Sequence, residues 1–517
     1  MNFYIYSWKL ARRIVLNSTS ISIMSKIKSY PLISAFVLGA LCVFGFSPYN
    51  LFIAPIVGLA GLFYFWQISH TPKQAAKVGF SFGLGFFIAG IYWIYISLHD
   101  IGGMPFWMAG IATLGLCAFL ALFPALVGFL AKRSHRLLMT AAIVWVLAEW
   151  VRSWIFTGFP WLSIGYSQVP FSPLAGYAPV FGAFGVSAAC AISASLLASI
   201  YLNHQRQRAI LALSGIWLIG ALISLIPWTT PAGKPLNVTL LQGNIAQELK
   251  WDEAIAFQTI NQYLSMAKQA KGELVILPET ALPISVDTQL QDASQDQVLS
   301  AFNTVAQEQH KAILLGLVAK DKEAYFNSVL GFNSVDNRPQ FYHKYHLVPF
   351  GEFIPLKAVF GWVYRDWLNM PLSDLSRGEK YQQPIQLANQ KIAVNICYED
   401  VFGEEIIRQL PQATLLVNVS NDAWYGRSNA ADQHMQFSQM RALETGRTML
   451  RATNTGSTTI ITPQGMILAL LPQFETAILN GSAQGYVGAT PFVRWGNWPT
   501  ISLLLIALIL LWGRKKK

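Results

Sequence analysis

Eight long apolar stretches limit what this 517-residue chain can fold into. A helix needs about 20 mainly apolar residues to cross roughly 30 Å of hydrocarbon. The stretches lie at about 31–48, 51–69, 78–98, 104–131, 137–157, 175–202, 209–228 and 498–513. Charged residues make up only 12% of the chain, against about 25% in soluble proteins. We therefore predict a polytopic α-helical membrane domain, with seven spans in residues 1–228 and an eighth span followed by a basic tail in residues 496–517.

The basic residues between the stretches fall in alternate connections. They are Lys73 and Lys77, then Lys132, Arg133 and Arg136, then Arg206 and Arg208. The connections 49–50, 99–103 and 158–174 contain no Lys or Arg. Because cytoplasmic loops of membrane proteins are enriched in Lys and Arg, this alternation predicts that both termini are cytoplasmic and that residues 229–495 lie outside. In a bacterium, the outside is the periplasmic face of the inner membrane.

The first apolar stretch could instead be a cleaved signal sequence, because Leu38–Cys42 resembles a lipoprotein cleavage site. Leu41, however, is too large for the small residue that precedes such a cut. Cleavage would also leave an odd number of spans and invert the alternation of charge. We therefore expect the stretch to remain as a span.

The net charge of +11 does not indicate a nucleic-acid partner, because the excess of positive charge belongs to the membrane part. Residues 229–495 carry 20 basic residues against 24 acidic ones. A net acidic domain has no surface suited to following a phosphate backbone.

Residues 229–495 contain short apolar runs that alternate with amphipathic helical patterns. The runs are Val238–Leu241, Leu274–Leu277, Ala312–Leu317, Ile392–Ile396, Thr414–Val419 and Thr458–Ile461, and the helical patterns lie near 251–270, 289–309 and 434–450. Such alternation predicts a layered α/β domain whose sheet is covered by helices.

Cys397 is the one cysteine outside the apolar stretches, since Cys42, Cys117 and Cys190 each lie within one. It follows an apolar run and precedes a helix-like run through Leu410. A thiol at such an elbow is more often core packing than a nucleophile, although backbone N–H groups and a helix dipole there favour the thiolate. The adjacent carboxylates at 399 and 400 raise the pKa of a thiol, so a stabilising cation must come from elsewhere.

Two further segments supply a carboxylate and a cation. Glu279 comes just after a strand-like run, where α/β enzymes place reactive groups, although it could also be a capping or solvent-facing residue. Lys344 and Glu352 lie in an aromatic and apolar setting, where a lone Lys is usually a surface residue with a buried stem.

Taken together, these segments resemble the nitrilase superfamily, and most closely its membrane-anchored branch, the apolipoprotein N-acyltransferases. The resemblance covers nearly the whole chain and rests on Gly158–Leu162, Gly165–Gln168, Leu241–Asn244, Lys250–Trp251, Pro278–Thr280, His343–Glu352, Cys397–Glu399 and Val419–Trp424. It implies that residues 229–495 form an αββα sandwich carrying a catalytic Glu279, Lys344 and Cys397. It also implies that Trp251, Glu352, Tyr398 and Glu399 surround this triad.

The resemblance further implies a reaction. An acyl chain passes from a membrane phospholipid to Cys397 as a thioester, and then to the α-amino group of an S-diacylglyceryl-cysteine apolipoprotein. Acyl transfer needs a nucleophile, a proton shuttle and a donor to the oxyanion, which Cys397, Glu279 and Lys344 would supply. We expect no cofactor and no metal, because the His343 and His346 spacing alone is a weak motif. We expect a monomer.

Aromatic residues suggest contact with lipid. Residues 359–372, which include Trp362 and Trp367, are apolar inside an otherwise acidic domain. Two interpretations remain open for them: a lid that dips into the membrane interface, and ordinary core. Trp161 follows the fifth stretch, and we expect it at headgroup depth, where Trp also serves as an anchor.

Two other functions compete with acyl transfer to lipoproteins. A membrane-anchored nitrilase-like amidohydrolase would use the same triad with water as acceptor, but eight spans exceed what a tether requires. A transporter usually marks its pathway with buried ionisable groups, and here only Glu149 and Arg152 are candidates at depth.

Overall fold

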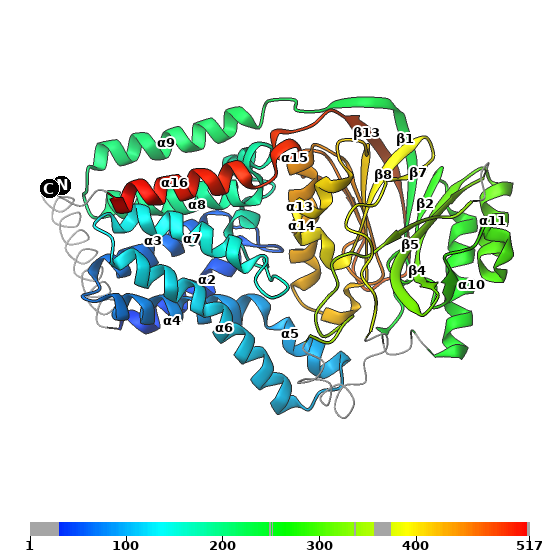
Figure 1. Ribbon diagram of the computed structural model, residues 1–517, viewed down its shortest axis with the longest axis horizontal. Coiled ribbons are helices and arrows are strands. Elements are labelled where there is room, and N and C mark those ends of the chain that lie inside the picture. Colours follow the sequence, from blue (N-terminus) through cyan, green and yellow to red (C-terminus); the bar gives the residue numbers. More distant parts are fainter. Residues whose placement is uncertain (1–29, 248–249, 251, 335–337, 356–373, 514–517) are drawn as a thin grey trace, which may run out of the picture.

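The computed structural model describes residues 30–247, 250, 252–334, 338–355 and 374–513, and it joins a helical bundle to a domain of two sheets (Figure 1). Each apolar stretch overlaps one helix of the bundle. These helices are α2 (Pro31–Cys42), α3 (Ile53–Ile68), α4 (Pro72–Ile91), α6 (Phe106–Lys132), α7 (Leu137–Arg152), α8 (Ala178–Tyr201), α9 (Arg206–Ile223) and α16 (Trp498–Gly513).

Among the described residues, four helical segments are long and apolar enough to cross a membrane. They are Pro72–Ile91, Phe106–Lys132, Pro173–Tyr201 and Arg206–Ile223. The apolar helices at Pro31–Gly45, Ile53–Ile68 and Trp498–Leu511 are shorter. The number of eight spans therefore stays a prediction.

Some basic residues expected in connections lie inside helices. Lys73 and Lys77 belong to the first turns of α4, whose N-terminus is capped by Thr71 Oγ1 accepting a hydrogen bond from the Gln74 N–H. Arg206 and Arg208 begin α9. The apolar pattern located the helices, but the capping residue and not the first apolar residue sets where α4 begins.

Two sheets form the second part of the chain. In the first sheet, β3 (Ser285–Asp287) pairs with β4, and the other strands run in the order β13 (Ala477–Val487), β1 (Thr230–Gln242), β2 (Leu274–Ile276), β4 (Ala312–Asp321), β5 (Ala324–Asn333) and β6 (Gln340–His343). The second sheet has the order β12 (Ile467–Leu470), β11 (Thr459–Ile461), β10 (Met449–Thr453), β9 (Leu415–Ser420), β8 (Gln390–Ile396) and β7 (Ile385–Leu387). Every run predicted as a strand overlaps one of these strands and extends beyond it by at most one residue.

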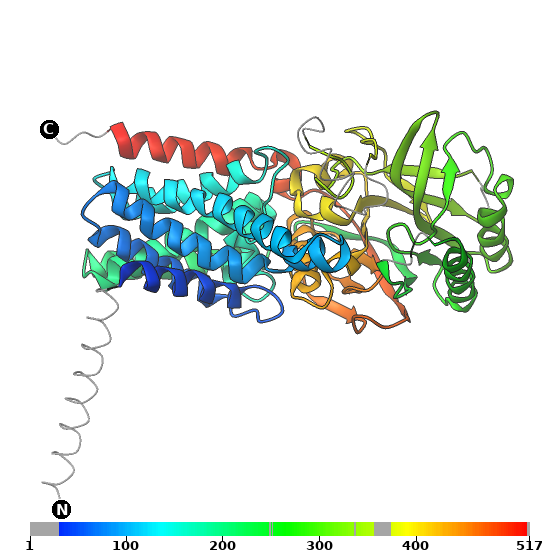
Figure 2. The same ribbon diagram turned by 90° about the horizontal axis from the view of Figure 1, so that it is seen from below.

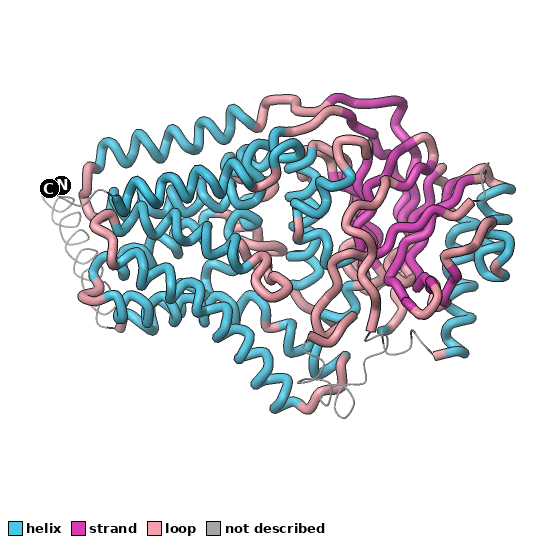
Figure 3. The backbone as a smooth tube through the Cα atoms, in the orientation of Figure 1, coloured by secondary structure: helices cyan, strands magenta, loops and turns pink. Residues whose placement is uncertain are grey.

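The sheets pack face to face, and helices cover both outer faces (Figure 3). A core that includes Ile276, Val394 and Val417 fills the space between the sheets. On the first sheet, α10 (Glu253–Gln269) and α11 (Gln297–Glu308) bury residues such as Phe302. On the second, α13 (Gly403–Ile406) and α14 (Ala430–Thr445) bury Ala442 among others. The layers agree with an αββα sandwich.

Helix α14 lies between the second sheet and the bundle (Figures 1 and 2). Ala442 packs with the sheet, whereas Phe437 and Met440 join the core of the bundle. The bundle and the sandwich are therefore in continuous contact through this helix.

Two helical expectations were wrong in detail. The pattern at 434–450 predicts one helix, but α14 ends at Thr445, where Gly446 adopts a left-handed conformation with φ of 63°. The helix-like run after Cys397 consists of short turns, η7 (Cys397–Val401), α13 and η8 (Ile407–Gln409). Cys397 therefore does not face a long helix, and the dipole expected there is small.

Glu149 and Arg152 bind the connection between α7 and α8. Arg152 donates hydrogen bonds to the carbonyls of Phe159 (2.9 Å) and Trp161 (2.6 Å). Glu149 accepts one from the Ile164 N–H at 2.9 Å. Both charged groups thus hold a folded connection, which accounts for their burial without a transport pathway.

Candidate active site

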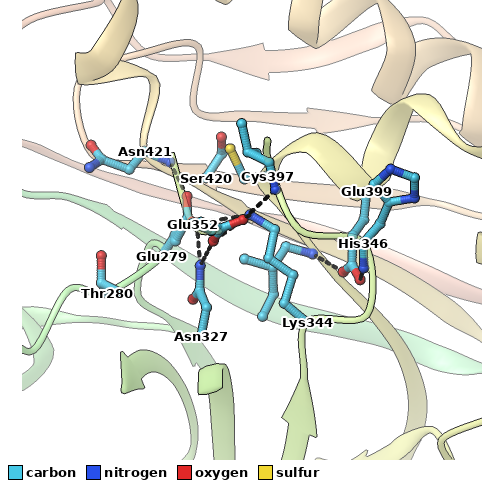
Figure 4. A network of polar contacts seen from close by, with 12 residues as sticks. Glu279, Thr280, Asn327, Lys344, His346, Glu352, Cys397, Glu399, Ser420 and Asn421 are labelled. Atoms are coloured by element: carbon cyan, nitrogen blue, oxygen red, sulfur yellow. Dashed lines mark hydrogen bonds and ion pairs between the residues drawn. The ribbon is translucent and has the colours of Figure 1, made fainter. Parts of the chain in front are cut away.

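The three predicted catalytic residues lie at the carboxyl ends of strands. Cys397 directly follows β8, Lys344 directly follows β6, and Glu279 comes shortly after β2. The two sheets present these ends to one another, and Figure 4 shows the three side chains together with Glu352. The structure therefore brings together residues that are far apart in the sequence.

Glu279 is surrounded by hydrogen-bond donors. Its Oε1 accepts from Asn327 Nδ2 at 2.7 Å, and its Oε2 accepts from the Asn421 N–H at 2.8 Å. Lys344 Nζ lies 3.5 Å from Oε1. These contacts fix the direction of the carboxylate.

Lys344 is 1% exposed and lies between two carboxylates. Its Nζ is 2.9 Å from the Glu352 carboxylate and 3.5 Å from that of Glu279. Burial lowers the pKa of Lys344, but the charges of Glu352 and Glu279 outweigh it and raise this pKa above its usual value. The ammonium group therefore stays charged at neutral pH.

Cys397 is 6% exposed and adopts a left-handed conformation with φ of 53°. This conformation costs a non-glycine residue free energy and is common at active sites. Burial and the nearby Glu279 raise the pKa of the Cys397 thiol, while Lys344 opposes them. The resting thiol is therefore protonated, and a base must remove its proton.

Glu399 supports the loop that carries Lys344. Its Oε1 accepts from the N–H groups of Tyr345 (2.7 Å) and His346 (3.1 Å), and its Oε2 accepts from the Ile396 N–H (2.7 Å) and the Tyr342 hydroxyl (3.0 Å). Burial raises the pKa of Glu399 to about 7. The Glu399 carboxylate, two residues after Cys397 in sequence, thus binds backbone N–H groups and a tyrosine hydroxyl. The carboxylates that raise the thiol pKa are those of Glu279 and, to a smaller extent, Asp422.

Tyr398 and Trp161 link the site to the bundle. The Tyr398 hydroxyl donates to the Gly158 carbonyl at 3.0 Å, and its ring stacks on that of Trp161. Trp161 is 1% exposed, and its Nε1 donates to Gln433 Oε1 on α14 at 2.7 Å. An anchoring role through contact with lipid is therefore wrong for Trp161, because the ring is enclosed between bundle and sandwich. Trp251, Trp362 and Trp367 lie outside the described residues.

Sequence reasoning assigned no role to two polar residues of the site. Asn327, within β5, donates from Nδ2 to both Glu279 and Glu352 at 2.7 Å. Lys250 is buried, donates to the Glu279 carbonyl at 3.2 Å and also contacts the Thr280 hydroxyl. Burial lowers the pKa of Lys250 to about 8. Asn is depleted in strands, so its position inside β5 was the available signal for Asn327.

The chain matches two family models. Residues 38–196 match the apolipoprotein N-acyltransferase N-terminal domain, and residues 237–492 match the carbon-nitrogen hydrolase family. The two matches correspond to the bundle and to the sandwich.

Relatives that match over nearly their full length are named apolipoprotein N-acyltransferases. An apolipoprotein N-acyltransferase from Nitrosomonas europaea is 50% identical over 491 residues, which is 94% of this chain and 97% of that protein. One from Chromobacterium violaceum is 44% identical over 497 residues, or 94% of each chain. Among solved structures, XC1258 from Xanthomonas campestris, a CN-hydrolase superfamily protein, is 14% identical with a TM-score of 0.36 and covers 55% of this chain and 99% of its own.

Proposed function

The chain belongs to the apolipoprotein N-acyltransferase family, and we propose that it transfers an acyl chain from a membrane phospholipid to the N-terminal amino group of an S-diacylglyceryl-cysteine apolipoprotein. It is an acyltransferase with a nitrilase-like α/β domain and several apolar helices. The observation that carries the mechanism is the cluster of a thiol, a carboxylate and an ammonium group at neighbouring strand ends (Figure 4).

The first half-reaction forms a thioester. Cys397 Sγ attacks the ester carbonyl of the phospholipid while Glu279 takes the thiol proton. The resulting oxyanion is stabilised by the Lys344 ammonium group and by the Tyr398 N–H. When the C–O bond breaks, Glu279 returns the proton to the lysophospholipid oxygen, and the acyl chain remains on sulfur.

The second half-reaction consumes the thioester. The N-terminal amine of the apolipoprotein attacks the thioester carbonyl, and Glu279 accepts a proton from the nitrogen. The C–S bond then breaks, the sulfur takes that proton back, and an amide is released. The thiol and the carboxylate return to their starting states, so the cycle needs no further reactant.

The remaining site residues act through this cluster. Glu352 balances the charge of Lys344, and Glu399 holds the loop that presents it. For Trp251 we keep the expectation that it lies beside the triad, and for Trp362 and Trp367 the expectation that they belong to a lid in the membrane interface. We assign residues 1–228 to the membrane domain, 229–495 to a periplasmic catalytic domain and 496–517 to the last span and a cytoplasmic tail.

The acceptor distinguishes acyl transfer from hydrolysis. We expect purified protein, given a phospholipid and a synthetic diacylglyceryl-cysteine peptide, to form an amide-linked acyl peptide and lysophospholipid in equal amounts. Mass spectrometry of the peptide measures the first product, and lipid analysis measures the second. Release of free fatty acid with an unmodified peptide would instead identify an amidohydrolase-like enzyme with water as acceptor.

The proposed topology places the sandwich outside the cytoplasm. We expect alkaline phosphatase fused at 73–77, 132–136 or 206–208 to be inactive in a bacterial host, because the basic residues there favour the cytoplasm. Fusion at residue 300 should be active. Green fluorescent protein at the same positions, which fluoresces only in the cytoplasm, should give the opposite pattern. A cytoplasmic residue 300 would separate the enzyme from exported lipoproteins and contradict the proposal.

A further inference from the structure

A buried polar network contacts the backbone of the nucleophile, and the mechanism above does not use it. Its central contact is the backbone carbonyl of Cys397, which accepts hydrogen bonds from His434 Nε2 at 3.1 Å and from Asn418 Nδ2 at 3.3 Å. The double contact falls on the peptide group that joins Cys397 to Tyr398.

Both ring nitrogens of His434 face acceptors. Nε2 faces the Cys397 carbonyl, and Nδ1 is 2.8 Å from Asp422 Oδ1. A neutral imidazole has one donor nitrogen and one acceptor nitrogen, so either neutral tautomer would point a lone pair at an oxygen. Only the imidazolium form donates in both directions.

The charges packed around His434 suit a cation. Asp422, in η9 (Asp422–Tyr425), also binds Arg451 Nη2 of β10 at 2.9 Å. Arg451 lies 3.5 Å from the carboxylate of Asp400 in η7, and the thiol of Cys397 lies in the same element. Burial raises the pKa of Asp422, but Arg451 and His434 outweigh it and hold this pKa well below its usual value. Arg451 thus lies between the carboxylates of Asp422 and Asp400 in a fully buried site.

We propose that His434, held as an imidazolium by Asp422, is a positioning residue that polarises the Cys397–Tyr398 peptide and thereby strengthens the Tyr398 N–H as a donor to the oxyanion. This inference rests on the proposed acyl transfer. It gives α14, which contacts the bundle, a direct connection to the reaction centre.

The physical reason is cooperativity between hydrogen bonds. A carbonyl that accepts a charge-assisted hydrogen bond draws electrons from its amide nitrogen, so the N–H of the same peptide becomes a stronger donor. The same contact holds Cys397 at its φ of 53°. Both effects matter when negative charge develops on the oxygen next to Tyr398 N, and they change the ground state little.

The test compares His434→Gln, which offers a neutral donor of similar reach, with Asp422→Asn, which removes the charge that supports the imidazolium. We expect the rate of thioester formation from phosphatidylethanolamine to fall about 10- to 100-fold in His434→Gln, with the KM for the phospholipid nearly unchanged. Asp422→Asn should reduce it in the same way. Gln439→Met is the matched control, because Gln439 is buried on the same helix and donates to Gly465.

The thioester carbonyl stretch reports the oxyanion donors without depending on rate. In acyl-enzyme carrying a ¹³C-labelled carbonyl, we expect the stretch to move to higher wavenumber in both variants and to stay in place in Gln439→Met. An unchanged stretch, or thioester formation within twofold of wild type in a folded His434→Gln protein, would overturn the proposal. If the wild-type enzyme forms no thioester at all, the proposed function fails instead.

A second measurement needs no substrate. In protein labelled with ¹⁵N-histidine, the His434 signals, assigned by their loss in His434→Gln, should show two protonated ring nitrogens at pH 7. A neutral tautomer at this pH would contradict the inference whether or not the enzyme is active.

Discussion

Replacing Cys397 by Ala is expected to abolish the acyl-enzyme, whereas joint replacement of Cys42, Cys117 and Cys190 by Ala should leave it nearly intact. Cys397 lies in the cluster with Glu279 and Lys344, and the other three thiols are buried in bundle helices. Loss of the nucleophile should reduce acyl transfer by a factor on the order of 10⁶, as when other nucleophiles are removed. Cys397→Ser should also fail, because a carboxylate base cannot readily generate an alkoxide.

The measurement is incubation with phospholipid, intact-protein mass spectrometry and treatment with neutral hydroxylamine, which cleaves thioesters faster than ordinary esters. The triple Ala variant serves as the background in which Cys397 is the one remaining cysteine. An adduct that persists in Cys397→Ala would place the acyl chain elsewhere. An adduct that survives hydroxylamine in the wild type would show that it is not a thioester.

The sequence pattern located most elements of the fold, because buried apolar residues recur along helices and strands in runs of characteristic length and spacing. Long apolar runs gave the bundle helices, and short ones gave the strands that are buried on both faces, such as β8 and β9. The fully buried β10 was missed because its first residues continue the helical pattern at 434–450, and strands with mixed burial were missed as well. β13, for example, alternates between buried and exposed positions and contains Gly481 and Gly485, so its composition resembles a loop.

Site residues could be predicted where the residue type and its sequence motif indicate the chemistry. They could not be predicted where the role depends on a contact made only in the folded structure. Glu279, Lys344 and Cys397 stand in segments with recognisable composition. Asn327 does not, because its importance comes from a position between two carboxylates that only strand pairing creates. His434 likewise acquires its role from the distance between α14 and the end of β8.

The same distinction explains the interpretation of Glu399. Because Glu399 lies close to Cys397 in sequence, it was expected to raise the thiol pKa. Its carboxylate instead binds the backbone of the loop that carries Lys344. Adjacent residues after a strand point in different directions, so adjacency did not indicate which carboxylate faces the sulfur. The largest charge effect that raises the thiol pKa comes from Glu279, more than a hundred residues away, and Asp422 adds to it.

Glu279→Gln and Lys344→Met are expected to shift the pKa of the Cys397 thiol in opposite directions while both abolish rapid acylation. The carboxylate of Glu279 raises this pKa and the ammonium group of Lys344 lowers it. Removing the negative charge should therefore lower the thiol pKa, and removing the positive charge should raise it further. The rate of alkylation by iodoacetamide as a function of pH, in the triple Ala background, measures this shift.

Acylation should nevertheless fall in both variants. Glu279→Gln has no base to take the thiol proton, a loss of about 10²- to 10⁴-fold. Its amide must also point its NH₂ group toward either the Asn421 N–H or Asn327 Nδ2, both donors to Glu279. Lys344→Met loses a cation beside the developing oxyanion, which should slow acylation about 10²- to 10³-fold. It also leaves two carboxylates without their cation, so its melting temperature must be measured alongside.

A lower thiol pKa in Glu279→Gln makes the thiolate more available, and this alone would speed the attack. If acylation is nevertheless slower, the loss comes from the missing proton acceptor and not from the changed charge at the sulfur. Acylation of Glu279→Gln at the wild-type rate would mean that another group is the base, and a shift of both variants in one direction would mean that the two charges do not act on the sulfur as the structure indicates.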